Sequence, residues 1–178
     1  MDERHVTSCD TPLRILIVCA ANRFRSPLAE HLLRRDWAAH HVEVASAGIQ
    51  AVSGQPPHPL ALELAADRGL PELQMHRSRR LTPSMIRAFD LVLTMDEMQQ
   101  REVLKATPAF TGRVLMLGCW RNVAIEDPVA NAAVSCQRTL DLLRDCLGDW
   151  KERLHGSGLL PLRSMSIAGA AQEMSDAG

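Results

Sequence analysis

Several features that define other protein classes are missing from this chain of 178 residues. Tyrosine is absent, so the protein cannot be regulated by phosphorylation of its own tyrosines. Apolar runs fall well short of the ~20 residues that a membrane-spanning helix needs, which excludes a transmembrane protein. The five cysteines are odd in number and scattered, so we expect no disulfide framework and a cytoplasmic location. The formal net charge of −1 gives no overall attraction to nucleic acid or an anionic membrane, and we expect neither as a partner.

The composition that remains is that of a globular domain. Hydrophobic residues make up 46% of the chain and charged residues 23%, both typical of soluble proteins. We expect one domain over residues 13–155. Residues 1–12 are predicted to be a polar N-terminal extension without the apolar core of a signal peptide, and residues 156–178 a mobile C-terminal tail.

Short apolar runs alternate with helix signals along this domain. The predicted strands cover residues 13–19, 42–47, 90–95 and 113–117. The predicted helices start at Ser26-Pro27 with Ser26 as N-cap, at about Pro59, after Thr82 and after Asp96, and a closing helix covers 134–154. This alternation predicts an α/β domain whose parallel sheet is covered by helices on both faces. Ligands of such sheets bind at the carboxyl ends of the strands.

The loop after the first strand carries a pattern suited to phosphate. Its predicted phosphate-binding residues are Ala20, Ala21, Asn22, Arg23, Phe24 and Arg25. Their N–H groups can curl inward as an anion nest at the positive end of the following helix. Arg25 can hold two phosphate oxygens, and these positive surroundings favour the thiolate form of Cys19. A thiolate in a phosphate cradle predicts attack on phosphorus; the alternative is a buried cysteine in an ordinary strand–helix turn.

A phosphoryl transfer of this kind also needs a proton donor. Asp127 is the only aspartate followed directly by proline, and Pro128 biases it toward an extended conformation that holds its carboxyl in a fixed direction. Because it follows the fourth predicted strand, Asp127 is expected at the edge of the site. It could protonate the leaving oxygen and then activate water. The alternative is an Asp-Pro turn in a surface loop.

The motif Cys19-x-x-Asn22-x-x-Arg25-Ser26-Pro27-x-Ala29-Glu30 closely resembles the signature of the low-molecular-weight protein tyrosine phosphatases. Further matches follow in order over residues 13–155: Ser46-Ala47-Gly48, His76-x-Ser78-Arg79, residues 90–96 and Glu126-Asp127-Pro128. The resemblance implies a four-stranded parallel sheet in a three-layer, flavodoxin-like arrangement. It also implies Cys19 as nucleophile, Arg25 as phosphate clamp and Asp127 as general acid. A supporting polar network is implied for Asn22, Ser26, Ser46 and His76.

The resemblance further implies hydrolysis of phosphomonoesters through a cysteinyl-phosphate, with protein phosphotyrosine as the usual substrate and neither metal nor other cofactor. A phosphorylated protein is then the expected partner, with a bacterial tyrosine kinase as one candidate. Two alternatives stay open. Arsenate reductase shares the fold but needs resolving cysteines, and only Cys119 is conceivable. A non-catalytic phosphate-binding protein is the other.

Four residues depart from the family pattern. Ala21 stands where the family usually has glycine, which costs about 1–2 kcal/mol if the position requires positive φ. Arg23 replaces an aliphatic residue beside the substrate, and either adds a cation at the mouth that favours an acidic substrate or points into water. Phe24 replaces a second cysteine. Val129 stands where relatives often have the tyrosine that would stack on a phosphotyrosine ring, a role that Trp120 could take over.

Overall fold

A four-stranded parallel sheet forms the centre of the molecule. The computed structural model describes residues 11–129, 135–160 and 162, so most of the extension and tail predicted at the two termini lies outside the described residues. The strand order is β2-β1-β3-β4, and all three neighbouring pairs are parallel. This confirms the predicted fold class. The strands are β1 (Leu13–Cys19), β2 (Val42–Gly48), β3 (Leu91–Thr94) and β4 (Val114–Met116).

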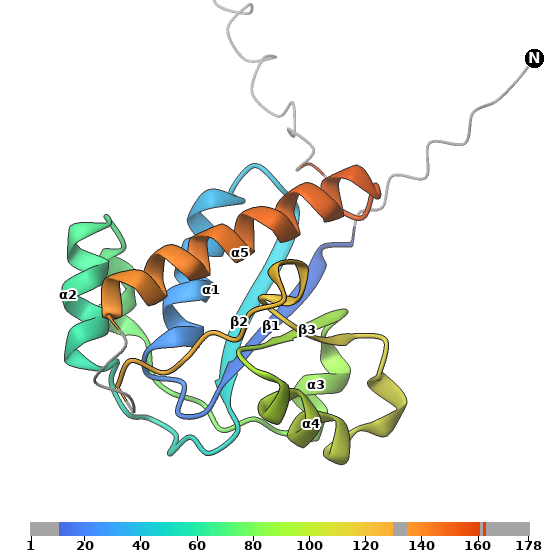
Figure 1. Cartoon of the computed structure of the whole chain (residues 1–178), viewed down its shortest axis with the longest axis horizontal. Coiled ribbons are helices and arrows are strands. Elements are labelled where there is room, and N and C mark those ends of the chain that lie inside the picture. Colours follow the sequence, from blue (N-terminus) through green and yellow to red (C-terminus); the bar gives the residue numbers. More distant parts are fainter. Residues whose placement is uncertain (1–10, 130–134, 161, 163–178) are drawn as a thin grey trace, which may run out of the picture.

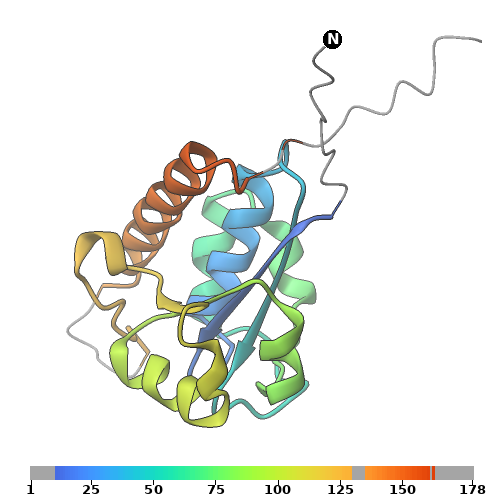
Figure 2. The same cartoon turned by 90° about the vertical axis from the view of Figure 1, so that its right-hand side faces the viewer.

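Helices cover both faces of this sheet (Figures 1 and 2). The α-helices are α1 (Arg25–Asp36), α2 (Pro59–Asp67), α3 (Pro83–Ala88), α4 (Glu97–Ala106) and α5 (Cys136–Gly156). Three short 3-10 helices that the sequence analysis did not predict are η1 (Pro71–Met75), η2 (Pro108–Phe110) and η3 (Cys119–Arg121). In the described part of the chain, no helix combines the length and apolar character needed to cross a membrane.

Alternate residues of β1 build two separate cores. Ile15, Ile17 and Cys19 join the core formed with α1, α2 and α5. Leu16 and Val18 point to the other face and pack with apolar residues of α3 and α4. Because side chains alternate along a strand, this seven-residue run is buried on both faces, which fixes β1 at the centre of the sheet.

The carboxyl ends of the strands meet at one edge. Cys19 ends β1 opposite Gly48 of β2, while Val18 lies opposite Thr94 of β3. The chain leaves β1 and β2 at the lower edge of the sheet in Figure 1. Since β1 is flanked by β2 on one side and β3 on the other, the strand order reverses here, and a ligand site is expected at this edge.

The first helix begins differently from the prediction. The residue at its N-cap is Phe24, which makes no side-chain cap, and Ser26 lies within the first turn. The prediction of Ser26 as N-cap was therefore wrong: its hydroxyl contacts Cys19 instead of a backbone N–H at the helix end. The predicted caps at Thr82 and Asp96 are confirmed, because each side chain accepts the backbone N–H of the residue three positions later, Met85 and Gln99 respectively.

Candidate active site

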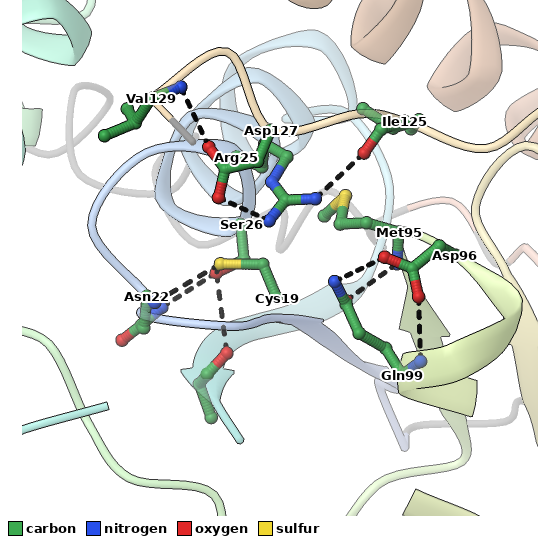
Figure 3. A network of polar contacts seen from close by, with 11 residues as sticks. Cys19, Asn22, Arg25, Ser26, Met95, Asp96, Gln99, Ile125, Asp127 and Val129 are labelled. Carbon is green, nitrogen blue, oxygen red and sulfur yellow. Dashed lines mark hydrogen bonds and ion pairs between the residues drawn. The ribbon is translucent and has the colours of Figure 1, made fainter. Parts of the chain in front are cut away.

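Cys19 lies at the last position of β1 with 3% of its surface exposed. The Asn22 N–H donates to its Sγ at 3.2 Å, and the Ser26 hydroxyl lies 3.0 Å from the same sulfur (Figure 3). The loop that curls around this sulfur is anchored to the chain after β2, because Ile49 N–H donates to the Cys19 carbonyl. The Asn22 N–H is thus a fixed donor to this sulfur, and the Ser26 hydroxyl is a second group able to donate to it.

The side chain of Asn22 links the loop after β1 to the segments packed against it. It is fully buried and has a φ of 55°, a left-handed conformation that asparagine tolerates better than most residues. Its side-chain N–H₂ donates to Ser26 at 3.0 Å and to Ser46 at 2.8 Å, and its side-chain oxygen accepts the Arg79 N–H at 2.8 Å. Nε2 of His76 lies 3.0 Å from the Asn22 carbonyl. The four residues assigned to the polar network are therefore brought together here.

A buried carboxylate extends this network, and the sequence analysis gave it no role. The Ser46 hydroxyl donates to one oxygen of Glu30, while Arg34 pairs with the other oxygen at 2.5 Å. With its only proton committed to Glu30, Ser46 presents a lone pair to Asn22. Nothing in the sequence indicates this contact, since it depends on the packing of α1 against β2.

Arg25 is the buried cation of the site, with 4% of its surface exposed. One Nη donates to the Ile125 carbonyl at 2.9 Å, and the other donates to a carboxylate oxygen of Asp127 at 2.6 Å (Figure 3). The second Asp127 oxygen accepts the Val129 N–H at 3.1 Å. The buried Nε of Arg25 has no hydrogen-bond partner among the described residues. A buried donor left unpaired is costly, and an anion at this point would satisfy it.

These groups open into one cavity. It has a volume of about 80 Å³, and it is lined by Cys19, Ala21, Arg23, Phe24, Arg25, His58, Asp127 and Val129. The structure therefore unites the three predicted catalytic residues and most of the predicted phosphate loop. His58 is a lining residue that the sequence analysis missed. A second cavity of about 560 Å³ between residues 123–126 and α5 is larger but contains no cysteine among its lining residues.

The departures from the family pattern have distinct structural outcomes. Among the described non-glycine residues only Asn22 and Asn122 have positive φ, so Ala21 carries no left-handed strain. Arg23 does not point freely into water: its Nε donates to the Pro56 carbonyl at 2.8 Å. Trp120 does not replace the missing aromatic wall, because its ring packs on that of Trp150 at 5.3 Å, away from the cavity.

Burial shifts the pKa of His76 and of two of the cysteines. Burial lowers the pKa of His76 below its ordinary 6.5, although its bond to the Asn22 carbonyl acts in the opposite direction. Since a carbonyl only accepts, the neutral ring carries its proton on Nε2. Burial raises the pKa of the Cys119 thiol and raises that of Cys146 to about 11. Neither thiol is ready to act as a resolving cysteine at neutral pH.

The model of the family "Low molecular weight phosphotyrosine protein phosphatase" matches residues 14–158. The chain belongs to this family. It is 37% identical over 144 residues to the probable low molecular weight protein-tyrosine-phosphatase EpsP of Ralstonia nicotianae, covering 81% of this chain and 97% of the relative. It is 33% identical to the low molecular weight protein-tyrosine-phosphatase Wzb of Escherichia coli K12, covering 79% and 95%.

Solved structures agree with this phosphatase assignment. The tyrosine phosphatase Wzb from Escherichia coli K30 in complex with sulphate has a TM-score of 0.74 at 28% identity, covering 81% of this chain and 99% of that one. The YwlE arginine phosphatase from Geobacillus stearothermophilus has a TM-score of 0.75 at 27% identity, covering 83% and 96%. The chain is therefore a phosphatase of the hydrolase class, and the arsenate reductase alternative is not favoured.

Proposed function

We propose that this phosphatase hydrolyses protein phosphotyrosine through a cysteinyl-phosphate, with Cys19, Arg25 and Asp127 as its catalytic residues. The observation that carries the proposal is the buried guanidinium of Arg25, whose Nε has no partner among the described residues. Arg25 lines the same small cavity as Cys19 and Asp127. A cation held in this way is suited to a doubly charged phosphoryl group directly above a nucleophile.

The phosphate loop supplies the remaining contacts. Residues 20–24 connect β1 to α1, which begins at Arg25, and the first N–H groups of α1 have no carbonyl one turn earlier to bind. These N–H groups and those of the loop would bind the phosphoryl oxygens, as expected at a helix N-terminus. Asn22, Ser26, Ser46 and His76 would hold the loop in place, and Ser26 would donate to the Cys19 thiolate.

The chemistry proceeds in two displacements. The Cys19 thiolate attacks phosphorus, the bond to the leaving oxygen breaks, and protonated Asp127 gives its proton to that oxygen. Water then attacks phosphorus, the sulfur–phosphorus bond breaks, and the Asp127 carboxylate takes the proton from the water. Inorganic phosphate and the Cys19 thiolate are the products, and no metal or other cofactor takes part.

In the structure, a carboxylate oxygen of Asp127 lies 2.6 Å from Nη2 of Arg25 and pairs with that edge of the guanidinium. An incoming phosphoryl group would take over this edge together with the free Nε, as a bidentate pair. The Ile125 carbonyl would keep its hold on the other Nη, so the guanidinium stays in place while its partner changes. Asp127 is then released toward the leaving oxygen.

A phosphorylated protein is the proposed substrate, since EpsP and Wzb are both named protein-tyrosine-phosphatases. A bacterial tyrosine kinase is the proposed partner, and a reducing cytoplasm the proposed location, where the thiol of Cys19 stays reduced. Val129 provides no aromatic surface beside the cavity, so phosphoserine and phosphoarginine peptides belong in any substrate panel.

The test is turnover of p-nitrophenyl phosphate by the wild type, Cys19→Ser and Asp127→Asn at pH 5–7. We expect activity in the wild type, none in Cys19→Ser, and a reduction of about 10²–10⁴-fold in Asp127→Asn, the usual contribution of a general acid. Trapping of ³²P on the wild type but not on Cys19→Ser would support the covalent intermediate. An inactive wild type that still binds phosphate would refute catalysis and favour the non-catalytic alternative.

A further inference from the structure

One ring side chain in the wall of the cavity takes no part in the proposed chemistry. We propose that His58 is a specificity-determining residue, whose imidazole forms the aromatic wall on which the ring of a phosphotyrosine packs. His58 lines the same cavity as Cys19 and Asp127. This inference rests on the proposed function and specifies its substrate class, aryl in preference to alkyl phosphomonoesters.

The backbone around His58 is restrained by its neighbours in the sequence. His58 ends the loop that leads from β2 to α2, which runs along the lower side of the molecule in Figure 1, where β1 and β2 end. Pro57 and Pro59 flank it, and their rings fix the φ angle on both sides. A residue before a proline favours extended backbone, and His58 has a φ of −65° and a ψ of 140°. The path of the chain at this point is therefore set before a ligand binds.

Three contacts hold the His58 imidazole in one orientation. Its Nδ1 accepts the Leu60 N–H at 3.3 Å, which makes His58 the N-cap of α2. The His58 N–H donates to the Arg23 carbonyl at 2.8 Å, which ties the residue to the phosphate loop. Its ring stands edge-on to the ring of Phe24, with centroids 6.3 Å apart and planes at 61°. Because the ring is already fixed, a ligand that packs on it incurs little ordering cost.

Phe24 makes this wall a property of the present chain. It stands where the family pattern has a second cysteine, and a cysteine would offer no ring for an edge-to-face contact. Among the described residues that line the cavity, Phe24 and His58 are the aromatic ones. Phe24 is 4% exposed, whereas His58 is only half-buried. Phe24 therefore supports the wall from inside, and His58 is the ring that a ligand can reach.

The size of the cavity explains why a wall at its mouth matters. A volume of about 80 Å³ is far below the ~300–1,000 Å³ of pockets that enclose drug-sized ligands. The cavity therefore takes the phosphoryl group, and the ring attached to it meets the residues at the mouth. Val129 is aliphatic, and Trp120 packs on Trp150 instead. Since Arg25 already serves the phosphoryl oxygens, the contribution left for His58 is its aromatic surface.

The test uses two phosphonates that differ only in their ring, benzylphosphonate and cyclohexylmethylphosphonate. Neither has a phosphoester bond to break, so their binding reports the ring contact without any leaving-group chemistry. We expect calorimetric titration of the wild type to give a dissociation constant about 2- to 10-fold lower for benzylphosphonate, the range of one aromatic pair. In His58→Asn the two constants should become equal. The ratio of kcat/KM for phosphotyrosine over phosphoserine peptides of the same sequence should fall by a similar factor.

Two substitutions separate the ring of His58 from its other properties. His58→Asn removes the ring but keeps an N-cap acceptor for the Leu60 N–H, so α2 stays capped. His58→Phe keeps a ring but loses both ring nitrogens, and it should retain the preference for benzylphosphonate. Loss of the preference in His58→Phe as well would show that His58 acts through a ring nitrogen, and would overturn the wall.

His155→Asn is the matched control. His155 lies in the last turn of α5, and its ring stands edge-on to that of His40 at 6.3 Å, just before β2 begins at the opposite edge of the sheet. Its substitution should leave the ratio of dissociation constants unchanged. Equal constants in the wild type, or the same loss in His155→Asn, would overturn the wall. A wild type that prefers benzylphosphonate but does not turn over p-nitrophenyl phosphate would instead overturn the proposed function, so the two failures are distinguishable.

Discussion

Gly48 provides the sharpest test of how the phosphate loop is built. A Cβ on this residue would lie 2.6 Å from the Ala20 carbonyl oxygen, 2.8 Å from the Asn22 nitrogen and 2.8 Å from the Ala51 Cβ. Two of these atoms belong to the backbone of the loop, and the third is a methyl without rotamers. None of them can move away without displacing either the loop or the end of β2.

Gly48→Ala should therefore affect both stability and catalysis. Overpacking of a tight site costs about 1–3 kcal/mol, and each kcal/mol lowers the melting temperature of a chain of this size by about 2–4 °C. Displacement of the Asn22 nitrogen also moves a donor of the Cys19 sulfur. Misplacement by about 1 Å can cost 10²-fold in rate, so we expect kcat on p-nitrophenyl phosphate to fall about 10- to 100-fold.

The matched control is Gly112→Ala, because a Cβ at Gly112 would have no atom within 4 Å and its φ is not left-handed. This substitution should change stability by less than about 0.5 kcal/mol and leave kcat at the wild-type value. Thermal unfolding followed by circular dichroism, together with steady-state kinetics, measures both quantities. Wild-type stability and kcat in Gly48→Ala would refute the reasoning.

Two further predictions concern titration. Burial lowers the pKa of His76 below 6.5, so as the pH falls from 7 to 5 the unfolded chain takes up a proton before the folded chain does, and the melting temperature should fall. The fall in melting temperature should be smaller in His76→Gln, whose side chain keeps a donor for the Asn22 carbonyl. His31, whose pKa burial also lowers, should still contribute to the fall in this variant. A fall as large as that of the wild type would contradict this. Iodoacetamide at pH 7 should label Cys19 while Cys146, with a pKa of about 11, stays unmodified, and comparable labelling of both by peptide mass spectrometry would contradict it.

The sheet could be predicted because its strands are short apolar runs with clear ends. The first strand has the predicted bounds 13–19, since the run is buried on both faces and a polar loop follows it. The third strand is shorter than predicted, Leu91–Thr94 in place of 90–95. A strand end is set by where its neighbour stops pairing, and that partner is distant in the sequence.

The site could be predicted only in part, because several of its contacts depend on the assembled fold. A serine before a proline is typical of a helix cap, yet the Ser26 hydroxyl faces the Cys19 sulfur once the loop has curled. A cost at Ala21 was expected only if that position required positive φ, and the loop assigns its left-handed residue to Asn22 instead. Glu30 meets Ser46 only because α1 packs on β2, and no local pattern marks that contact.

The ion pair between Arg25 and Asp127 has a consequence for the end of each cycle. In the proposed reaction, departure of inorganic phosphate would expose the Arg25 guanidinium, which the Asp127 carboxylate reaches at 2.6 Å in this structure. Product and carboxylate therefore compete for the same edge, and the tethered competitor has the higher effective concentration. Under the proposed mechanism, that exchange would weaken the rebinding of free phosphate and so favour release of the product.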